Sequence, residues 1–200
     1  MRSSVRATLA IVCTGVVLAA GCAQPPAEQA ASGAAAATQS PVDRGRYLVT
    51  LGGCHDCHTP KIFGPAGPEP DMTRQLSGHP PTDKTPPVPA GLLGPDGWGA
   101  VGSNHFTGWG GPWGISFARN LTPDVATGLG SWTEDMFIKT LRDGKHQGEG
   151  RPLLPPMPWQ MYRQATDEDL KAIWAFLRSI PAVNNAVPEP IPPAGAPPAQ

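Results

Sequence analysis

The stretch Cys54-His55-Asp56-Cys57-His58 decides how the rest of this sequence is interpreted. Two cysteines separated by two residues and followed directly by a histidine form the attachment motif for a c-type haem. Each thiol adds to one vinyl group of the porphyrin, and the adjoining imidazole becomes an axial ligand of the iron. The motif therefore predicts one covalently bound haem c, attached through Cys54 and Cys57 and ligated by His58.

Two other kinds of site also use a C-x-x-C pair. A thioredoxin-like redox pair occurs in a βαβ context, and a zinc site needs a second pair of ligands at a suitable spacing. Neither pattern is visible around Cys54 and Cys57, so the haem interpretation is preferred to both.

Composition limits the size of the folded part. The chain has 200 residues, of which 26 are proline and 24 are glycine, so we expect one domain with tails and much loop. The formal net charge is −1, which gives no basic face of the kind that binds nucleic acid.

The N-terminal residues predict export. Arg2 and Arg6 flank the start of an apolar run that ends in small residues, and this run is too short to span a membrane. The segment Leu18–Cys22 is similar to a bacterial lipobox, in which the cysteine carries a lipid. Ordinary signal cleavage near the same place is the alternative. We expect a periplasmic protein that contacts the membrane through a lipid on Cys22.

The sequence divides into four predicted segments, and the cysteines fit this division. Cys13 falls in the leader, Cys22 takes the lipid and the motif cysteines take the haem, which leaves no pair for a disulfide. The segments are a lipoprotein-type signal peptide (1–22), a flexible tether (23–40), a cytochrome c domain (41–183, with a loop insertion at 60–117) and a Pro/Ala-rich tail (184–200).

Three helices are predicted from capping residues and apolar periodicity. The first starts after Ser40 and the last after Thr166, while either Ser131 or Thr133 caps the second; they stop at Gly52-Gly53, Pro181 and Gly144 respectively. In the first helix, Tyr47, Leu48 and Leu51 are expected to share the apolar face. The last helix, with Leu170, Ile173, Trp174 and Leu177 on one face, is expected to dock on the first.

The insertion at 60–117 has weak periodicity and many Gly-Pro and Pro-Pro pairs. These pairs predict a long loop without regular structure. Its aromatic residues fall mainly in the second half, so residues 91–117 are expected to pack as an ordered flap that shields the porphyrin, while residues 65–89 are expected to be more mobile.

A second axial ligand is needed to close the other face of the iron, and electron carriers commonly use methionine there. Met157 lies among Pro155, Pro156 and Pro158, which fix the backbone and lower the entropy lost in presenting a sulfur. Met157 is therefore the preferred ligand. The alternatives for a bis-histidine site are His79, His105 and His146.

Several motifs together resemble a known family. They are Cys54–His58, Asn120–Asp124, Thr127–Gly130, Met157-Pro158 and Thr166–Leu170. Between about Asp43 and Val183 the chain resembles monohaem class I cytochromes c, and it is especially similar to the haem modules in cytochrome subunits of alcohol and sugar dehydrogenases. The resemblance implies an all-α class I cytochrome c fold with about three main helices around one covalent haem. It also implies that Met157 is the distal ligand.

One departure from that family affects the functional expectation. The dehydrogenase subunits commonly carry three haem modules, whereas this chain has a single C-x-x-C-H motif and a long insertion. We therefore expect a stand-alone electron carrier and not an enzyme. It would pass single electrons between redox partners such as a dehydrogenase, an oxidase or a quinol-linked complex. Two alternatives are a haem enzyme or ligand sensor with an open sixth position, and an interaction subunit of a dehydrogenase or oxidase complex.

Overall fold

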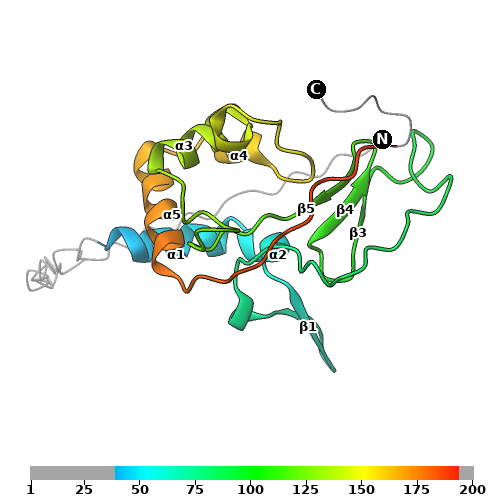
Figure 1. Cartoon of the computed structure of the whole chain (residues 1–200), viewed down its shortest axis with the longest axis horizontal. Helices are drawn as coiled ribbons and strands as arrows, with labels where there is room; N and C mark the ends of the chain where they lie inside the picture. The colour runs from blue at the N-terminus through cyan, green and yellow to red at the C-terminus, as the bar shows by residue number, and fades with distance from the viewer. Residues whose placement is uncertain (1–38, 194–200) are drawn as a thin grey trace, which may run out of the picture. The chain divides into compact units, whose positions relative to one another are not determined.

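The computed structural model describes residues 39–193 (Figure 1). The predicted signal peptide, Cys22, nearly all of the predicted tether and the last seven residues lie outside the described residues. Within them, no helix is long and apolar enough to cross a membrane. The helices are α1 (Pro41–Leu51), α2 (Cys54–His58), α3 (Glu134–Asp143), α4 (Trp159–Tyr162) and α5 (Asp167–Ser179), with 3-10 turns η1 (Met72–Arg74) and η2 (His146–Gly148).

The prediction of an all-α class I cytochrome c fold is wrong, because the insertion contains two β-sheets. β1 (Lys61–Gly64) pairs with β2 (Gly67–Pro70), and a second sheet has the order β3 (Val101–Gly102), β4 (Gly108–Gly111) and β5 (Gly114–Phe117). All pairs are antiparallel.

The difference has a physical reason in the glycine and proline pairs. Gly64 pairs with Gly67 across Pro65-Ala66, and Gly111 pairs with Gly114 across Pro112-Trp113. Two of the pairs that predicted a structureless loop, Gly64-Pro65 and Gly111-Pro112, therefore lie at the two-residue turns of β-hairpins, where such residues are also favoured.

The C-terminal segment extends the second sheet at its β5 edge. Ile191 forms an antiparallel bridge with Ile115, with N–H to carbonyl distances of 2.7 and 2.9 Å. The approach is close, because a Cβ at Gly114 would lie 2.0 Å from the Ile191 carbonyl oxygen. Gly114 also has a φ of +91°, a conformation that side chains disfavour. We call residues 181–193 the C-terminal strap.

The helix starts predicted from capping residues are confirmed, and of the two caps left open for the second helix, Ser131 and Thr133, the structure has Thr133. The side chains of Ser40, Thr133 and Thr166 each accept a hydrogen bond from the N–H three residues later, at the N-termini of α1, α3 and α5. The predicted stop of α3 is also confirmed, since Gly144 has a φ of +65°. These signals are local, so they do not depend on the rest of the fold.

The predicted docking of the last helix on the first is confirmed, because α5 crosses α1 and packs against it (Figure 1). The predicted apolar face of α1 is wrong, however. Tyr47 and Leu51 are exposed, whereas Gly45 and Val49 are buried. Gly45 allows close contact, because a Cβ there would lie 1.9 Å from the Ala172 carbonyl oxygen of α5.

The core lies between α1, α3, α5 and the loop that precedes α3. Its buried side chains are Val49, Leu76, Leu129, Phe137, Leu141, Leu170, Trp174, Phe176, Leu177 and Ile180. An ion pair at 2.9 Å between Arg44 of α1 and Asp169 of α5 lies at the edge of the helix contact.

The close contact at Gly45 gives a test of this packing. We expect Gly45→Ala to lower the free energy of unfolding by about 3 kcal/mol, because the added methyl group must separate α1 from α5. Urea denaturation of the purified protein measures the effect. Gly99→Ala is the matched control, since a Cβ at Gly99 has no neighbour within 4 Å. Equal stability of the two variants would contradict the close contact of α1 with α5 at Gly45.

Candidate haem site

A single helical turn carries both cysteines and the histidine of the motif. α2 begins after Gly53, whose φ is +65°, and the Asp56 N–H donates to the Gly53 carbonyl at 2.9 Å. A Cβ at Gly53 would lie 2.9 Å from the Asp56 carboxylate, so glycine suits this change of direction. Because positions three and four apart share a helix face, Cys54, Cys57 and His58 lie on one side of α2.

The ring of His58 is oriented by a backbone carbonyl. Its Nδ1 lies 2.8 Å from the Arg119 carbonyl oxygen, and a carbonyl can only accept, so Nδ1 carries the proton. Burial lowers the pKa of His58 below its ordinary value, which favours the neutral ring. Nε2 makes no hydrogen bond within residues 39–193, and its lone pair is therefore free to bind a metal.

The two thiols differ from those of a redox-active pair. Burial raises the pKa of Cys54 to about 11, and burial also raises the pKa of Cys57. Reactive C-x-x-C cysteines instead have a lowered pKa. Tyr162 lies beside Cys54 and donates its hydroxyl to the Gly52 carbonyl, and burial raises the pKa of Tyr162 to about 12.

This donor set fits a covalently attached haem better than a bare metal ion. Within residues 39–193, no three His, Cys, Asp or Glu side chains lie close enough together to hold an ion. A porphyrin supplies the equatorial ligands itself and needs only axial ones from the protein. Two neutral thiols and one oriented neutral imidazole on the same helical turn match that requirement.

The Arg119 carbonyl is held in place by the turn that follows it. The buried Asn120 side chain accepts from the Thr122 N–H at 3.0 Å and from the Thr122 hydroxyl at 2.7 Å. Its amide donates to the Val183 carbonyl at 2.8 Å and to the Thr127 hydroxyl at 3.0 Å. Asn120 thus connects the turn that orients His58 to the C-terminal strap.

A lysine at the end of α2 is a further supporting residue that sequence reasoning missed. The Lys61 ammonium donates to the carbonyls of His55 at 3.1 Å, Asp56 at 2.9 Å and Thr59 at 2.6 Å. These bonds satisfy carbonyls that a helix end leaves without partners. The signal that could have identified Lys61 is a basic residue just after a helix C-terminus.

The proposed distal ligand packs on the same core as the attachment helix. Met157 and Cys54 are both partly buried against the core cluster. The other methionines within residues 39–193 are exposed, and they are Met72, Met136 and Met161. The segment before Met157 is fixed to the second sheet, since the Ser116 hydroxyl donates to the Pro155 carbonyl at 2.6 Å.

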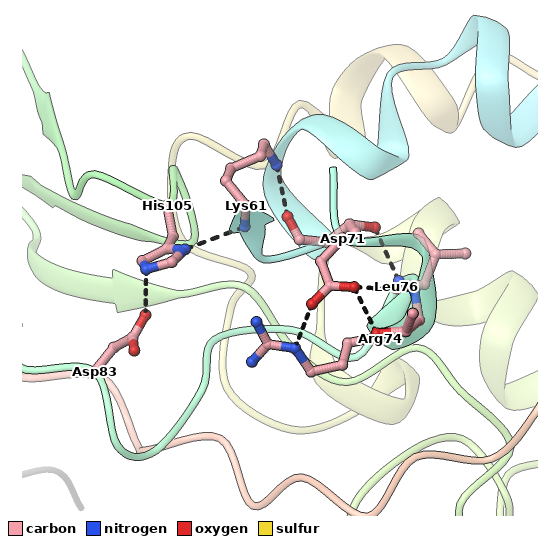
Figure 2. A network of polar contacts seen from close by, with 8 residues as sticks. Lys61, Asp71, Arg74, Leu76, Asp83 and His105 are labelled. Atoms are coloured by element: carbon pink, nitrogen blue, oxygen red, sulfur yellow. Dashed lines mark hydrogen bonds and ion pairs between the residues drawn. The ribbon is translucent and has the colours of Figure 1, made fainter. Parts of the chain in front are cut away.

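The three alternative histidines differ in how their ring nitrogens are used. His79 is buried, with Nδ1 at 2.8 Å from the Thr107 hydroxyl, whereas its Nε2 has no hydrogen-bond partner among the described residues. The His146 ring packs edge-on against Trp132, with centroids 5.1 Å apart. The third alternative is His105, whose contacts are shown in Figure 2.

His105 joins three parts of the insertion (Figure 2). Its Nδ1 accepts from the Lys61 N–H at 3.1 Å, and its Nε2 lies 3.3 Å from the Asp83 carboxylate. Nearby, Asp71 pairs with Arg74 at 2.8 Å, and the Leu76 N–H donates to the Thr59 hydroxyl at 2.9 Å. These contacts fix the start of β1, which directly follows α2.

Similarity to known proteins agrees with a haem site of this kind. No protein-family model matches the chain. The fructose dehydrogenase cytochrome subunit of Gluconobacter japonicus is 29% identical over 167 residues, which cover 82% of this chain and 26% of that protein. The gluconate 2-dehydrogenase cytochrome c subunit of Pantoea cypripedii is 30% identical over 136 residues, or 68% and 22%. The cytochrome c subunit of the quinone-dependent alcohol dehydrogenase of Gluconobacter oxydans is 35% identical over 65 residues, or 32% and 13%.

The chain therefore spans about a quarter or less of the length of these relatives. All three are cytochrome subunits of dehydrogenases, and two of them align with most of the chain. They support a relationship between this chain and the cytochrome c family.

The buried His79 predicts how stability depends on pH. Burial lowers its pKa in the folded state, whereas an unfolded histidine titrates near about 6.5. As the pH falls below that value, the unfolded state takes up the proton first, and the free energy of unfolding decreases. Burial lowers the pKa of His55 and His146 as well, which adds to the same trend.

We therefore expect His79→Gln to reduce the loss of stability between about pH 7.5 and about pH 5.5, by up to about 1.4 kcal/mol per pH unit. Urea denaturation at a series of pH values measures this slope. Asn185→Ala is the control, since its amide donates to the carbonyls of Ser77 and His79 and its loss removes no titratable group. If His79→Gln kept the parent's dependence of unfolding free energy on pH, His79 would not be the source of the loss of stability at low pH.

Proposed function

We propose that this chain is an exported c-type cytochrome that carries single electrons between redox partners through one covalently bound haem. The observation that carries the proposal is the Cys54–His58 turn, in which the His58 ring is oriented by the Arg119 carbonyl at 2.8 Å. A haem bound there supplies an iron that alternates between the ferric and ferrous states.

The residues of the chain have distinct tasks in this proposal. Cys54 and Cys57 would hold the porphyrin through thioether bonds, and His58 would bind the iron through Nε2. Met157 would be the second protein ligand, and its thioether would stabilise the ferrous state and raise the reduction potential. Its packing against the core cluster supports this choice, and so do the contacts of His105, which use both ring nitrogens of that alternative ligand.

The partner is proposed from the relatives. Those with the greatest coverage are cytochrome subunits of dehydrogenases, which supports a role in electron transfer or as a subunit of a dehydrogenase complex. In this role the chain takes electrons from a dehydrogenase and passes them on without performing the substrate chemistry itself. The contact with such a partner is expected to be small and transient.

Location and domain organisation are proposed from the sequence. Residues 1–22 direct export to the periplasm and end at a lipid-carrying Cys22, and residues 23–40 link that anchor to the cytochrome domain. Export agrees with the haem assignment, since c-type haem is attached outside the bacterial cytoplasm.

Haem attachment is the first test of the function. We expect the protein produced in a bacterium with c-type haem attachment to gain the mass of one haem, which acid-acetone extraction does not remove. Replacing both Cys54 and Cys57 by alanine removes this mass, because no thioether bond can form. Cys22→Ala is the control and keeps the haem. A parent protein without covalent haem contradicts the proposed function.

The distal ligand is tested separately. We expect Met157→Ala to retain covalent haem but to lose the far-red sulfur–iron absorption band of the ferric protein and to have a lower reduction potential. Met161→Ala is the matched control, because Met161 is 70% exposed and lies four residues away. Redox-resolved absorption spectra measure both properties. An unchanged band in Met157→Ala would exclude this residue as the ligand.

A further inference from the structure

Two arginine side chains meet at one carboxylate on the C-terminal strap. The Arg119 guanidinium lies 3.2 Å from the Glu189 carboxylate, and the Arg151 guanidinium lies 3.9 Å from its other oxygen. Arg119 also donates to the strap carbonyls of Val187 at 3.4 Å and Pro188 at 3.2 Å. Both arginine side chains are about one-third exposed, whereas the Glu189 side chain is 73% exposed.

The charges of this cluster do not balance. Burial lowers the pKa of Arg151, and repulsion from Arg119 lowers it further. His146 lies in the same cluster, and burial followed by the two arginines lowers its pKa, which favours its neutral form. Glu189 is the carboxylate that the described residues bring to both guanidiniums. The two partly buried guanidiniums thus share one exposed carboxylate. Their positive charge is only partly neutralised, so they can bind further carboxylates.

Each arginine adjoins one of the two proposed iron ligands, Arg119 through a contact and Arg151 along the chain. The carbonyl of Arg119 orients the His58 ring. Arg151 lies six residues before Met157, and its carbonyl accepts from the His146 N–H at 2.9 Å. Both guanidiniums that meet at Glu189 therefore belong to residues close to a proposed ligand, by contact for Arg119 and by sequence for Arg151.

We propose that Arg119 and Arg151 form the binding site for the two propionate carboxylates of the haem. This inference rests on the proposed function, since it requires haem at Cys54–His58. Guanidinium groups match carboxylates in geometry, because each presents two parallel N–H donors to two oxygens. Glu189 then completes the cluster as a third, solvent-facing carboxylate on the strap.

The test uses resonance Raman spectra of the full-length haem protein. The propionate bending band falls in frequency when a propionate loses a hydrogen-bond donor. We expect Arg119→Gln and Arg151→Gln each to lower this band relative to the parent. Each variant also lowers the reduction potential, because loss of a nearby positive charge favours the ferric state.

Two control variants separate propionate binding from other effects. Arg142→Gln removes the same charge at a site that pairs with Asp167 of α5, and it leaves the band unchanged. Glu189→Gln releases the strap contact while keeping both guanidiniums, and it also leaves the band in place. Arg119→Lys and Arg151→Lys serve where the glutamine variants do not accumulate, and they lower the band because the paired donors are lost.

The outcomes distinguish this inference from the proposed function. A parent protein without covalent haem overturns both. A haem protein in which the arginine variants keep the parent band overturns the propionate assignment alone. A shift in Glu189→Gln as large as that in the arginine variants also overturns it, because the two guanidiniums would then act only by holding the strap.

Discussion

The hydrogen bond between Nδ1 of His58 and the carbonyl oxygen of Arg119, 2.8 Å long, is the contact on which the candidate site depends. It fixes the tautomer of the imidazole, with the proton on Nδ1, and leaves the lone pair on Nε2. The carbonyl is in turn held by Asn120, whose amide reaches the Val183 carbonyl at the start of the strap. The orientation of the His58 ring on α2 therefore depends on the turn at Asn120 and, through it, on the C-terminal strap.

The β-structure of the insertion supports this arrangement. β5 ends at Phe117, two residues before Arg119, and the chain between them is fixed from both sides. The Ala118 N–H donates to the Thr107 carbonyl at 2.8 Å, and the Ala118 carbonyl accepts from the His79 N–H at 2.9 Å. The second sheet therefore positions the Arg119 carbonyl beside the His58 ring. Sequence reasoning missed this contact, because every residue has a backbone carbonyl and the residue type at position 119 does not reveal that its carbonyl accepts from His58.

Sequence reasoning succeeded where the determining interaction was local. Thr133 and Thr166 cap their own helices, and the C-x-x-C-H spacing fixes which residues share the α2 turn. It failed where the partner was distant, since the buried face of α1 depends on Gly45 meeting α5. The hairpins were missed because glycine and proline occur both in loops and in two-residue turns such as that within Gly111–Gly114. Strands as short as β4 and β5 offer little alternation of apolar and polar residues to indicate their pairing.

Gly114 couples two distant positions of the sequence. Its missing side chain is required because the Ile191 carbonyl oxygen occupies the space that a Cβ would take. A homologue with any other residue at this position cannot lay its C-terminus along β5 in the same way. Among related chains, the residue at position 114 therefore indicates from sequence alone whether the C-terminal strap can pair with the β5 edge. Only chains with glycine there can share this pairing.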